Sequence, residues 1–230
     1  MTPVRVVFLG PPGAGKGTQA VRLAQQYGIP RISTGDILRH AVHAGTDIGR
    51  LVKHTVERGE LVADDLVMRI VSERVSRADA RRGFVLDGFP RTVEQAQGLE
   101  ELMLGRGGVI AIDIMVGESE LIRRLASRMV CRDCGVAADA VGPACRACGG
   151  PLMMRGDDKE AVVLERLALY RRVTAPLVAF YRSRAQLYAV DGAKASDLVG
   201  ADIRAIVERR CAGRAASTES ASEGPESVIV

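Results

Sequence analysis

Five short apolar runs alternate with amphipathic stretches along most of this chain. In these runs apolar side chains follow one another directly, as in strands that are buried on both faces of a parallel sheet. The runs cover residues 4–9, 31–33, 84–87, 109–116 and 187–190. Because strands that alternate with helices form layered α/β domains, the pattern predicts a doubly wound α/β fold with a parallel five-stranded sheet flanked by helices.

The amphipathic stretches carry helix signals at their ends. Residues 16–27 repeat apolar side chains at helical spacing and stop at Gly28, a common residue just after a helix. Residues 64–76 show the same spacing behind two acidic residues, which favour a helix N-terminus. Thr174, two places before Pro176, predicts the N-cap of a further helix.

Two stretches and the end of the chain interrupt the alternation. Residues 33–62 are polar and read as short helices, whereas residues 127–158 are loop-rich and hold four of the five cysteines. We expect both to be insertions at the carboxyl edge of the sheet. Residues 212–230 have little to bury and are predicted to be disordered. The core domain then consists of residues 1–32, 63–126 and 159–211.

A glycine-rich loop, GPPGAGKGT at residues 10–18, joins the first predicted strand to the first helix. Glycines let successive backbone N–H groups turn toward one anion, the helix N-terminus adds a partial positive charge, and Lys16 adds a full one. The loop therefore predicts a nucleotide polyphosphate site, the alternative being an ordinary strand-to-helix turn. Because Gly17 follows the lysine and the hydroxyl comes only at Thr18, we expect Mg²⁺ to be held less directly than in motor or signalling ATPases.

The segment DGFPR, from Asp87 to Arg91, directly follows the third predicted strand. A carboxylate at this end of a strand can orient the waters around Mg²⁺, and Arg91 can reach a second phosphate group. The alternative is a strand-ending turn with a surface arginine. Its position beside the glycine loop favours a functional site.

Four cysteines form two CxxC pairs that are separated by ten residues: Cys131, Cys134, Cys145 and Cys148. Four thiolates at this spacing are typical of structural Zn²⁺, which would hold together a flap with little apolar core of its own. Two disulfides or a redox pair are the alternatives, and iron in place of zinc stays open. Cys211 stands alone and reads as a simple thiol.

Composition adds limits to the class of partner. The chain of 230 residues is 47% hydrophobic and 26% charged, with a net charge of +4. This composition suits a soluble enzyme that acts on small polyanions better than a protein that binds nucleic-acid duplexes. The first nine residues lack the pattern of a signal peptide, and no apolar run is long enough to cross a membrane. We expect a cytoplasmic protein that binds no membrane.

The motifs together resemble the adenylate kinases, in the long form with a zinc-bearing lid. They stand in the family's order between residues 4 and 194: GPPGAGKGTQA, STGDILR at residues 33–39, GELV at 59–62, LDGFPRTVEQA at 86–96 and RGDD at 155–158. The resemblance implies a P-loop NTPase-like core, an AMP-binding flap at residues 33–62 and a zinc-ribbon-like lid at 127–158. It also implies a monomeric, Mg²⁺-dependent enzyme that moves a phosphoryl group from ATP to AMP and gives ADP.

The resemblance assigns roles to particular residues. Arg124 and Arg128, four apart on the helix before the lid, are a like-charge pair that mildly destabilises a bare helix unless an anion lies between them. The resemblance supplies ATP as that anion. Asp157 and Asp158 can orient neighbouring guanidinium groups or help to close the lid. The predicted catalytic residues are Lys16, Asp87, Arg91, Arg124, Arg128, Arg155 and Arg166.

The nucleotide contacts follow from the same resemblance. Gln95 is expected to read the adenine of AMP, because an amide both donates and accepts hydrogen bonds. The predicted ATP-binding residues are Gly13, Ala14, Gly15, Lys16, Gly17, Thr18, Arg124, Arg128 and Lys194. The predicted AMP-binding residues are Thr34, Arg39, Glu60, Leu61, Val62, Gly88, Phe89, Pro90, Arg91, Gln95, Arg155 and Arg166.

Three alternatives stay open at this stage. The stretch between the cysteine pairs is short and has no aromatic residue, so the choice between ATP and GTP as donor is undecided. UMP or CMP is a second possible acceptor, against which the Gln95 amide argues. A zinc-ribbon ATPase acting on nucleic acid is a third reading, although residues 131–148 carry only two arginines and two aspartates and no aromatic.

Overall fold

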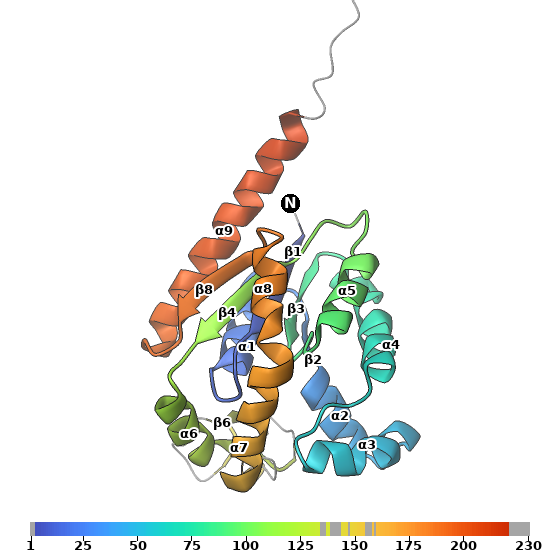
Figure 1. The fold of residues 1–230 in the computed structure, drawn as a ribbon, viewed down its shortest axis with the longest axis vertical. Helices are drawn as coiled ribbons and strands as arrows, with labels where there is room; N and C mark the ends of the chain where they lie inside the picture. Colours follow the sequence, from blue (N-terminus) through green and yellow to red (C-terminus); the bar gives the residue numbers. More distant parts are fainter. Residues whose placement is uncertain are drawn as a thin grey trace, which may run out of the picture.

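The computed structural model describes residues 3–133, 137–138, 144–146, 148–154, 158 and 160–220. A parallel five-stranded sheet in the order β2-β3-β1-β4-β8 runs through the middle of the molecule (Figure 1). Its strands are β1 (Val4–Leu9), β2 (Arg31–Ser33), β3 (Gly83–Asp87), β4 (Ile110–Met115) and β8 (Leu187–Asp191). The predicted fold class and its five strands are confirmed, and the strand ends differ from the prediction by at most one residue.

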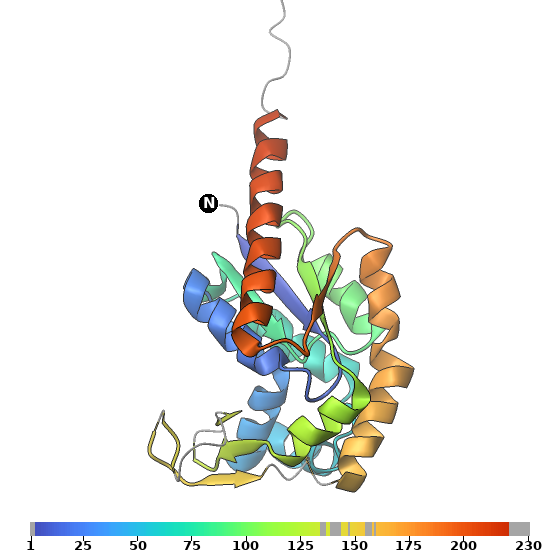
Figure 2. The same ribbon diagram turned by 90° about the vertical axis from the view of Figure 1, so that its left-hand side faces the viewer.

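Helices cover both faces of the sheet, as the side view in Figure 2 shows. One apolar cluster joins β1 and β4 to α1 (Lys16–Tyr27), α6 (Glu118–Ala126), α7 (Glu160–Leu169) and α9 (Ser196–Ser220). A second joins the sheet to α4 (Asp64–Val75), α5 (Val93–Leu102) and α8 (Pro176–Arg182). A 3-10 turn, Ala78–Ala80, precedes β3.

The central strand explains why the apolar runs do not alternate with polar residues. Val6 and Phe8 of β1 belong to the first cluster, whereas Val7 and Leu9 belong to the second. All four are at most 2 % exposed. Because successive side chains of a strand point to opposite faces, a strand between two helical layers is apolar at every position.

Two insertions extend from the carboxyl edge of the sheet. The first holds α2 (Thr34–His43) and α3 (Asp47–Glu57), with a small core of Leu38, Val52 and Leu66. The second holds an antiparallel sheet in the order β6-β5-β7, from β5 (Met129–Cys131), β6 (Ala137–Ala138) and β7 (Leu152–Met154). Both insertions lie at the lower end of the molecule in Figure 1.

The predicted N-cap at Thr174 is wrong. Thr174 ends a π-helical turn, Tyr170–Thr174, that continues α7 into α8 without a break. The backbone N–H of Ala175 donates to the carbonyl of Tyr170 at 2.9 Å, five residues earlier. Pro176 has no N–H and would crowd the carbonyl four residues before it, and the wider turn lets the helix pass this proline.

The prediction of disorder at the end of the chain is partly wrong. Helix α9 extends to Ser220, so residues 212–220 are helical, and residues 221–230 lie outside the described part. Extending an existing helix needs no new nucleus, and the alanines at 212, 215 and 216 are the best helix formers. Despite its length, neither α9 nor any other helix among the described residues is apolar enough to span a membrane.

Candidate nucleotide site

The glycine-rich loop folds around the ammonium group of Lys16. Nζ donates hydrogen bonds to the carbonyls of Gly10 and Pro11, at 2.7 and 2.8 Å. Burial lowers the pKa of Lys16 from 10.5 to about 7, against the opposing attraction of Asp87. Gly13 and Gly15 have φ values of +85° and +96°, a backbone conformation that glycine adopts readily. The loop at the start of α1 is therefore a compact cradle with a cation at its base.

The structure explains why a glycine follows the lysine. A Cβ on Gly17 would lie 3.3 Å from Oδ2 of Asp87 and 3.6 Å from Nη2 of Arg31. Arg31 and Asp87 form an ion pair, which a serine or threonine side chain at position 17 would crowd. The first hydroxyl on α1 is therefore displaced to Thr18, which is exposed.

Asp87 at the end of β3 is held by a residue that sequence reasoning missed. Arg31 donates to Oδ2 of Asp87, and its Nη2 also lies 2.7 Å from Oδ2 of Asp36. Burial raises the pKa of Asp36, but the Arg39 and Arg31 guanidinium groups outweigh it and hold that pKa below its ordinary value. Arg31 stands at the start of a strand with no motif around it, so the sequence alone gave no signal.

These two carboxylates fit the needs of Mg²⁺. Asp36 and Asp87 lie within reach of one guanidinium group at the carboxyl edge of the sheet, beside the phosphate loop. Carboxylate oxygens are the protein groups that Mg²⁺ and its bound waters prefer. The donor set therefore suits a hydrated magnesium ion.

The turn after β3 draws predicted AMP-binding residues together. The Gly88 carbonyl accepts from Oγ1 of Thr34 and from Nε of Arg91, both at 2.9 Å. Thr34 is buried in the first turn of α2. Arg39, one turn later on α2, is ion-paired with Asp36. The flap and the DGFPR turn are therefore joined by a hydrogen bond between Thr34 and Gly88.

Gln95 lies just beyond this turn and is 2 % exposed. Its Oε1 accepts from the backbone N–H of Arg91 at 2.8 Å. Its Nε2 donates to Oδ1 of Asp64 at 2.6 Å. Asp64 is a second residue that the sequence did not single out.

Asp158 joins two of the predicted arginines. Its carboxylate, fully buried, accepts two hydrogen bonds from Arg128, at 2.6 and 2.5 Å, and one from Arg166 at 2.9 Å. Both arginines are close enough to Lys16 to lower its pKa. The expected orienting role of Asp158 toward guanidinium groups agrees with this geometry.

The expected placement of Arg124 and Arg128 on one helix is wrong. Helix α6 ends at Ala126, and Arg128 lies in the turn that follows. The Ser127 hydroxyl donates back to the carbonyls of Arg123 and Arg124, which satisfies the helix end. Because the helix ends before Arg128, this side chain does not lie beside Arg124 on α6 and instead donates to Asp158.

Arg124 instead connects α6 to the turn after β8. It donates to Glu120 at 2.7 Å and to the carbonyl of Gly192 at 2.9 Å. Gly192 is two residues from Lys194, whose own side chain donates to Asp202 on α9. This places Arg124 near Lys194, which is also among the predicted ATP-binding residues.

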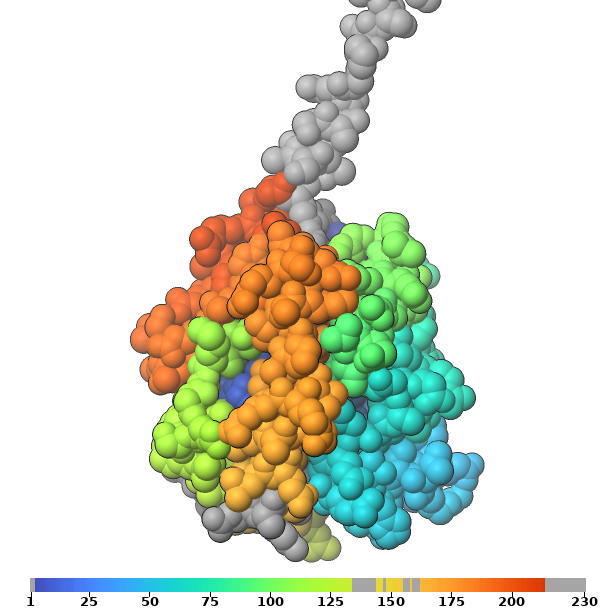
Figure 3. Space-filling model, viewed as in Figure 1, coloured from blue at the N-terminus to red at the C-terminus, as the bar shows by residue number. Residues whose placement is uncertain are grey.

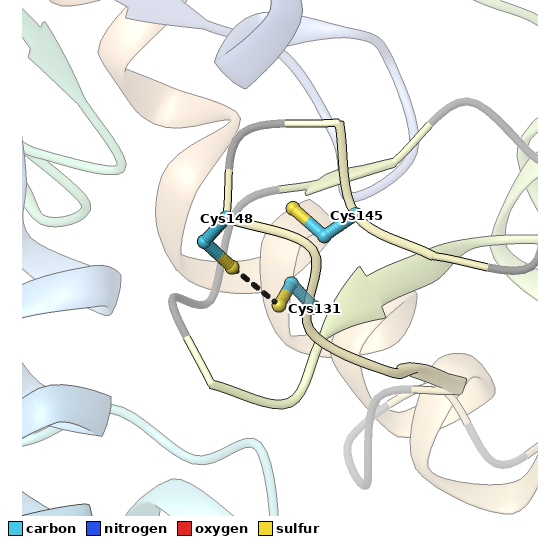
Figure 4. Close-up of side chains that lie close together, drawn as sticks. All are labelled: Cys131, Cys145 and Cys148. Atoms are coloured by element: carbon cyan, nitrogen blue, oxygen red, sulfur yellow. Dashed lines mark hydrogen bonds between the residues drawn. The ribbon is translucent and has the colours of Figure 1, made fainter.

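Three cysteines converge in the second insertion (Figure 4). The sulfurs of Cys131, Cys145 and Cys148 all lie within 4.8 Å of one another, and those of Cys131 and Cys148 are 3.4 Å apart. A tetrahedral zinc site with bonds of about 2.3 Å sets its sulfurs about 3.8 Å apart. The described thiols therefore fit a structural metal. Cys134 lies outside the described residues.

The remaining predicted residues fall into three groups: exposed or partly exposed residues, buried residues, and residues outside the described part. Leu61 and Val62 are partly exposed in the segment between α3 and α4, where Glu60 is ion-paired with Arg58. Phe89 is fully buried in the second apolar cluster and Pro90 is also buried. Arg155 and Asp157 lie outside the described residues.

A further buried carboxylate lies near the loop. Asp113 on β4 is 8 % exposed, and burial raises its pKa although Lys16 opposes this. Burial and the Asp113 charge together raise the pKa of Tyr170 to about 12. Asp113 falls within an apolar strand, and sequence reasoning did not select it.

The surface of the molecule has an opening between two elements (Figure 3). In the space-filling view, blue residues near the N-terminus are visible at the bottom of an opening between the lime-green segment with α6 and the orange segment with α7 and α8 (Figure 3). A polyanion could enter here between arginine-bearing segments.

Comparisons with known proteins agree with this geometry. The family model described as adenylate kinase matches residues 8–186. An adenylate kinase of Archaeoglobus fulgidus is 45% identical over 214 residues, which cover 90% of this chain and 99% of that protein. One of Methanocella arvoryzae is 44% identical over 216 residues, with 90% and 99% covered. One of Thermodesulfovibrio yellowstonii is 44% identical over 215 residues, with 90% and 100% covered.

Proposed function

This chain belongs to the adenylate kinase family, and on that premise we propose that it transfers the terminal phosphoryl group of ATP reversibly to AMP, giving two ADP for adenine nucleotide homeostasis. The observation that carries the proposal is the meeting of Lys16, Asp87 and the Arg128–Asp158–Arg166 group around one loop. Phosphoryl transfer needs charge neutralisation and alignment more than covalent help from the protein.

On the donor side, backbone N–H groups of residues 13–18 hold the ATP phosphates and Lys16 neutralises them. The partly buried lysine favours an anion as partner, because its ammonium group has lost part of its hydration and donates to two uncharged carbonyls. Arg128 and Arg166 stabilise charge on the transferred group, with Asp158 fixing their orientation. Arg124 and the backbone at Lys194 lie beside the base.

On the acceptor side, Arg91 and Arg39 bind the phosphate of AMP. Thr34 and the backbone of residues 60–62 and 88–90 line the nucleoside. Gln95 reads the adenine edge, with one N–H and one lone pair left over after its two protein contacts. Arg155 belongs to the same set by its place in the RGDD motif.

Two metals belong to the proposal. Asp87 and Asp36 would hold the waters of Mg²⁺, which supplies further charge neutralisation on the phosphates when it is bound. Cys131, Cys134, Cys145 and Cys148 would hold a structural Zn²⁺ that stabilises the lid. The enzyme is further proposed to act as a monomer in the cytoplasm.

The test is a coupled assay of ADP formation with metal-loaded protein. ATP is offered with AMP, UMP, CMP or GMP in the presence of Mg²⁺, and GTP replaces ATP in a second series. Fast turnover with AMP alone supports the acceptor assignment, and the GTP series decides donor choice. No transfer to any monophosphate by folded protein would overturn the proposal and favour an ATPase that acts on nucleic acid.

A further inference from the structure

The side-chain amide of Gln95 is hydrogen-bonded at both polar atoms. Nε2 donates to Oδ1 of Asp64 at 2.6 Å, and Oε1 accepts from the Arg91 backbone N–H at 2.8 Å. An ionised carboxylate only accepts and a backbone N–H only donates. These two partners therefore fix which end of the amide carries the nitrogen.

Asp64 links the start of α4 to the start of α5. It is the first residue of α4, directly after the flap, and its Oδ2 accepts from Oγ1 of Thr92 at 2.7 Å. Thr92 is the N-cap of α5, and its Oγ1 accepts from the backbone N–H of Gln95 at 3.1 Å. Both carboxylate oxygens of Asp64 are thus used to hold the start of α5 and the amide that projects from it.

The amide keeps one donor and one acceptor for a ligand. An amide has two N–H donors and two lone pairs on oxygen, and the protein uses one of each. The order of the remaining pair is fixed by the same contacts. Adenine presents an amino donor beside a ring-nitrogen acceptor, which matches an acceptor on Oε1 and a donor on Nε2. Hypoxanthine presents a carbonyl beside a ring N–H, which is the reverse order.

We infer that Asp64 is a positioning residue that makes the acceptor site select 6-aminopurine over 6-oxopurine monophosphates, by holding the Gln95 amide in one orientation. The inference rests on the proposed function, in which Gln95 contacts the acceptor base. Turning the amide over would set Oε1 against the Asp64 carboxylate and Nε2 against the Arg91 N–H. Two hydrogen bonds would be replaced by two repulsive contacts, so binding of IMP in the turned orientation carries a free-energy cost.

The test compares Asp64→Ala with Asp65→Ala in the full-length, metal-loaded enzyme. Asp65 is the next carboxylate in the first turn of α4 and is exposed, so it controls for the loss of one charge near the helix N-terminus. kcat and KM are measured for AMP and for IMP with ATP as donor. In Asp64→Ala only the Arg91 N–H still restrains the amide.

We expect the ratio of kcat/KM for AMP to that for IMP to fall about tenfold or more in Asp64→Ala, mainly through KM. The ratio in Asp65→Ala stays at the wild-type value. Asp64→Asn keeps one carbonyl oxygen that can accept from Nε2, so its ratio falls less, about threefold. If the alanine variant does not fold, the asparagine variant carries the test.

A merely structural link between α4 and α5 gives a different result. It would lower the thermal midpoint and reduce kcat/KM for both nucleotides by the same factor, leaving the ratio unchanged. An unchanged ratio in the folded Asp64 variants overturns the inference. Gln95→Leu distinguishes failure of the proposed function from failure of this inference. If kcat/KM for AMP is unchanged in Gln95→Leu, the proposed acceptor site is wrong. If only Gln95→Leu loses activity and the Asp64 variants behave as wild type, only the role of Asp64 is rejected.

Discussion

The guanidinium group of Arg31 donates to a single oxygen of Asp87 through both Nε, at 3.2 Å, and Nη2, at 2.6 Å. The same Nη2 lies 2.7 Å from Asp36, so that one cation bridges the end of β3 and the first turn of α2. The Asp87 side chain is 11% exposed, whereas Asp197, which pairs with Arg22 on the surface, is 89% exposed. The two ion pairs therefore differ sharply in how far water weakens them.

Replacing Arg31 is expected to cost more stability than replacing Arg22. Arg31→Gln leaves two carboxylates without their shared cation and lowers the free energy of unfolding by about 1–3 kcal/mol. Arg22→Gln removes an exposed pair and lowers it by about 0–1 kcal/mol. Urea unfolding followed by circular dichroism measures both. Equal small losses would mean that the Arg31 bridge acts as an ordinary surface pair.

Replacing Lys16 is expected to damage turnover and spare the fold. Lys16→Ala removes the cation from the phosphate cradle and lowers kcat by about 10²-fold or more, whereas its thermal midpoint stays near that of the wild type. The matched control is Lys53→Ala, an exposed lysine on α3 that lies 3.9 Å from Glu57. A Lys16 variant that stays folded and keeps near-normal turnover would remove the phosphate-cradle assignment.

Binding of ATP is expected to take up protons at mildly alkaline pH. Burial lowers the pKa of Lys16 to about 7, so at about pH 8.5 the amine is largely neutral in the free enzyme. Bound phosphates favour the charged form and raise that pKa, so binding takes up about one proton, and less at about pH 6 where the amine is already charged.

Isothermal titration in two buffers of different ionisation enthalpy measures this proton uptake. The uptake should disappear in Lys16→Ala and persist in Lys53→Ala. Equal uptake in wild type and Lys16→Ala would assign the linked proton to another group.

Asp158 is expected to matter for both stability and rate. Asp158→Asn removes the buried negative charge that Arg128 and Arg166 share, which lowers the free energy of unfolding by about 3–5 kcal/mol and reduces kcat through misplaced guanidinium groups. Asp133→Asn, an exposed carboxylate of the same insertion, is the control. Calorimetry and the coupled assay decide the matter, and wild-type values of both quantities in Asp158→Asn would contradict the expectation.

The cysteine cluster is expected to hold one metal ion per chain. Cys145→Ser removes a buried ligand, so metal content falls and the lid loses stability, which lowers the thermal midpoint. Cys211→Ser alters a thiol on α9, away from the cluster, and keeps the metal. Elemental analysis by mass spectrometry measures the content and tells zinc from iron. Full metal occupancy in Cys145→Ser would exclude this thiol as a ligand.

The sequence by itself determined the elements and the chemistry that is local in the chain. The consecutive apolar residues of β1 and the glycines of the loop depend on neighbours only a few places away, because side-chain alternation and backbone freedom are short-range properties. The strand–loop–helix order around Lys16 and the turn after β3 could therefore be predicted. The π turn before Pro176 could not, since it depends on whether the helix continues past the proline.

Only the tertiary structure decided which polar groups meet. Arg31 reaches Asp87 across 56 positions of sequence, and Asp64 reaches Gln95 across 31. Neither pair leaves a pattern in the chain, because a hydrogen bond depends on where strands and helices place two side chains and not on their spacing. Likewise, α6 ends before Arg128, so this residue lies outside the helix on which it was expected and donates to Asp158. Sequence thus fixes the reactive groups, and packing at the carboxyl edge of the sheet fixes their partners and orientation.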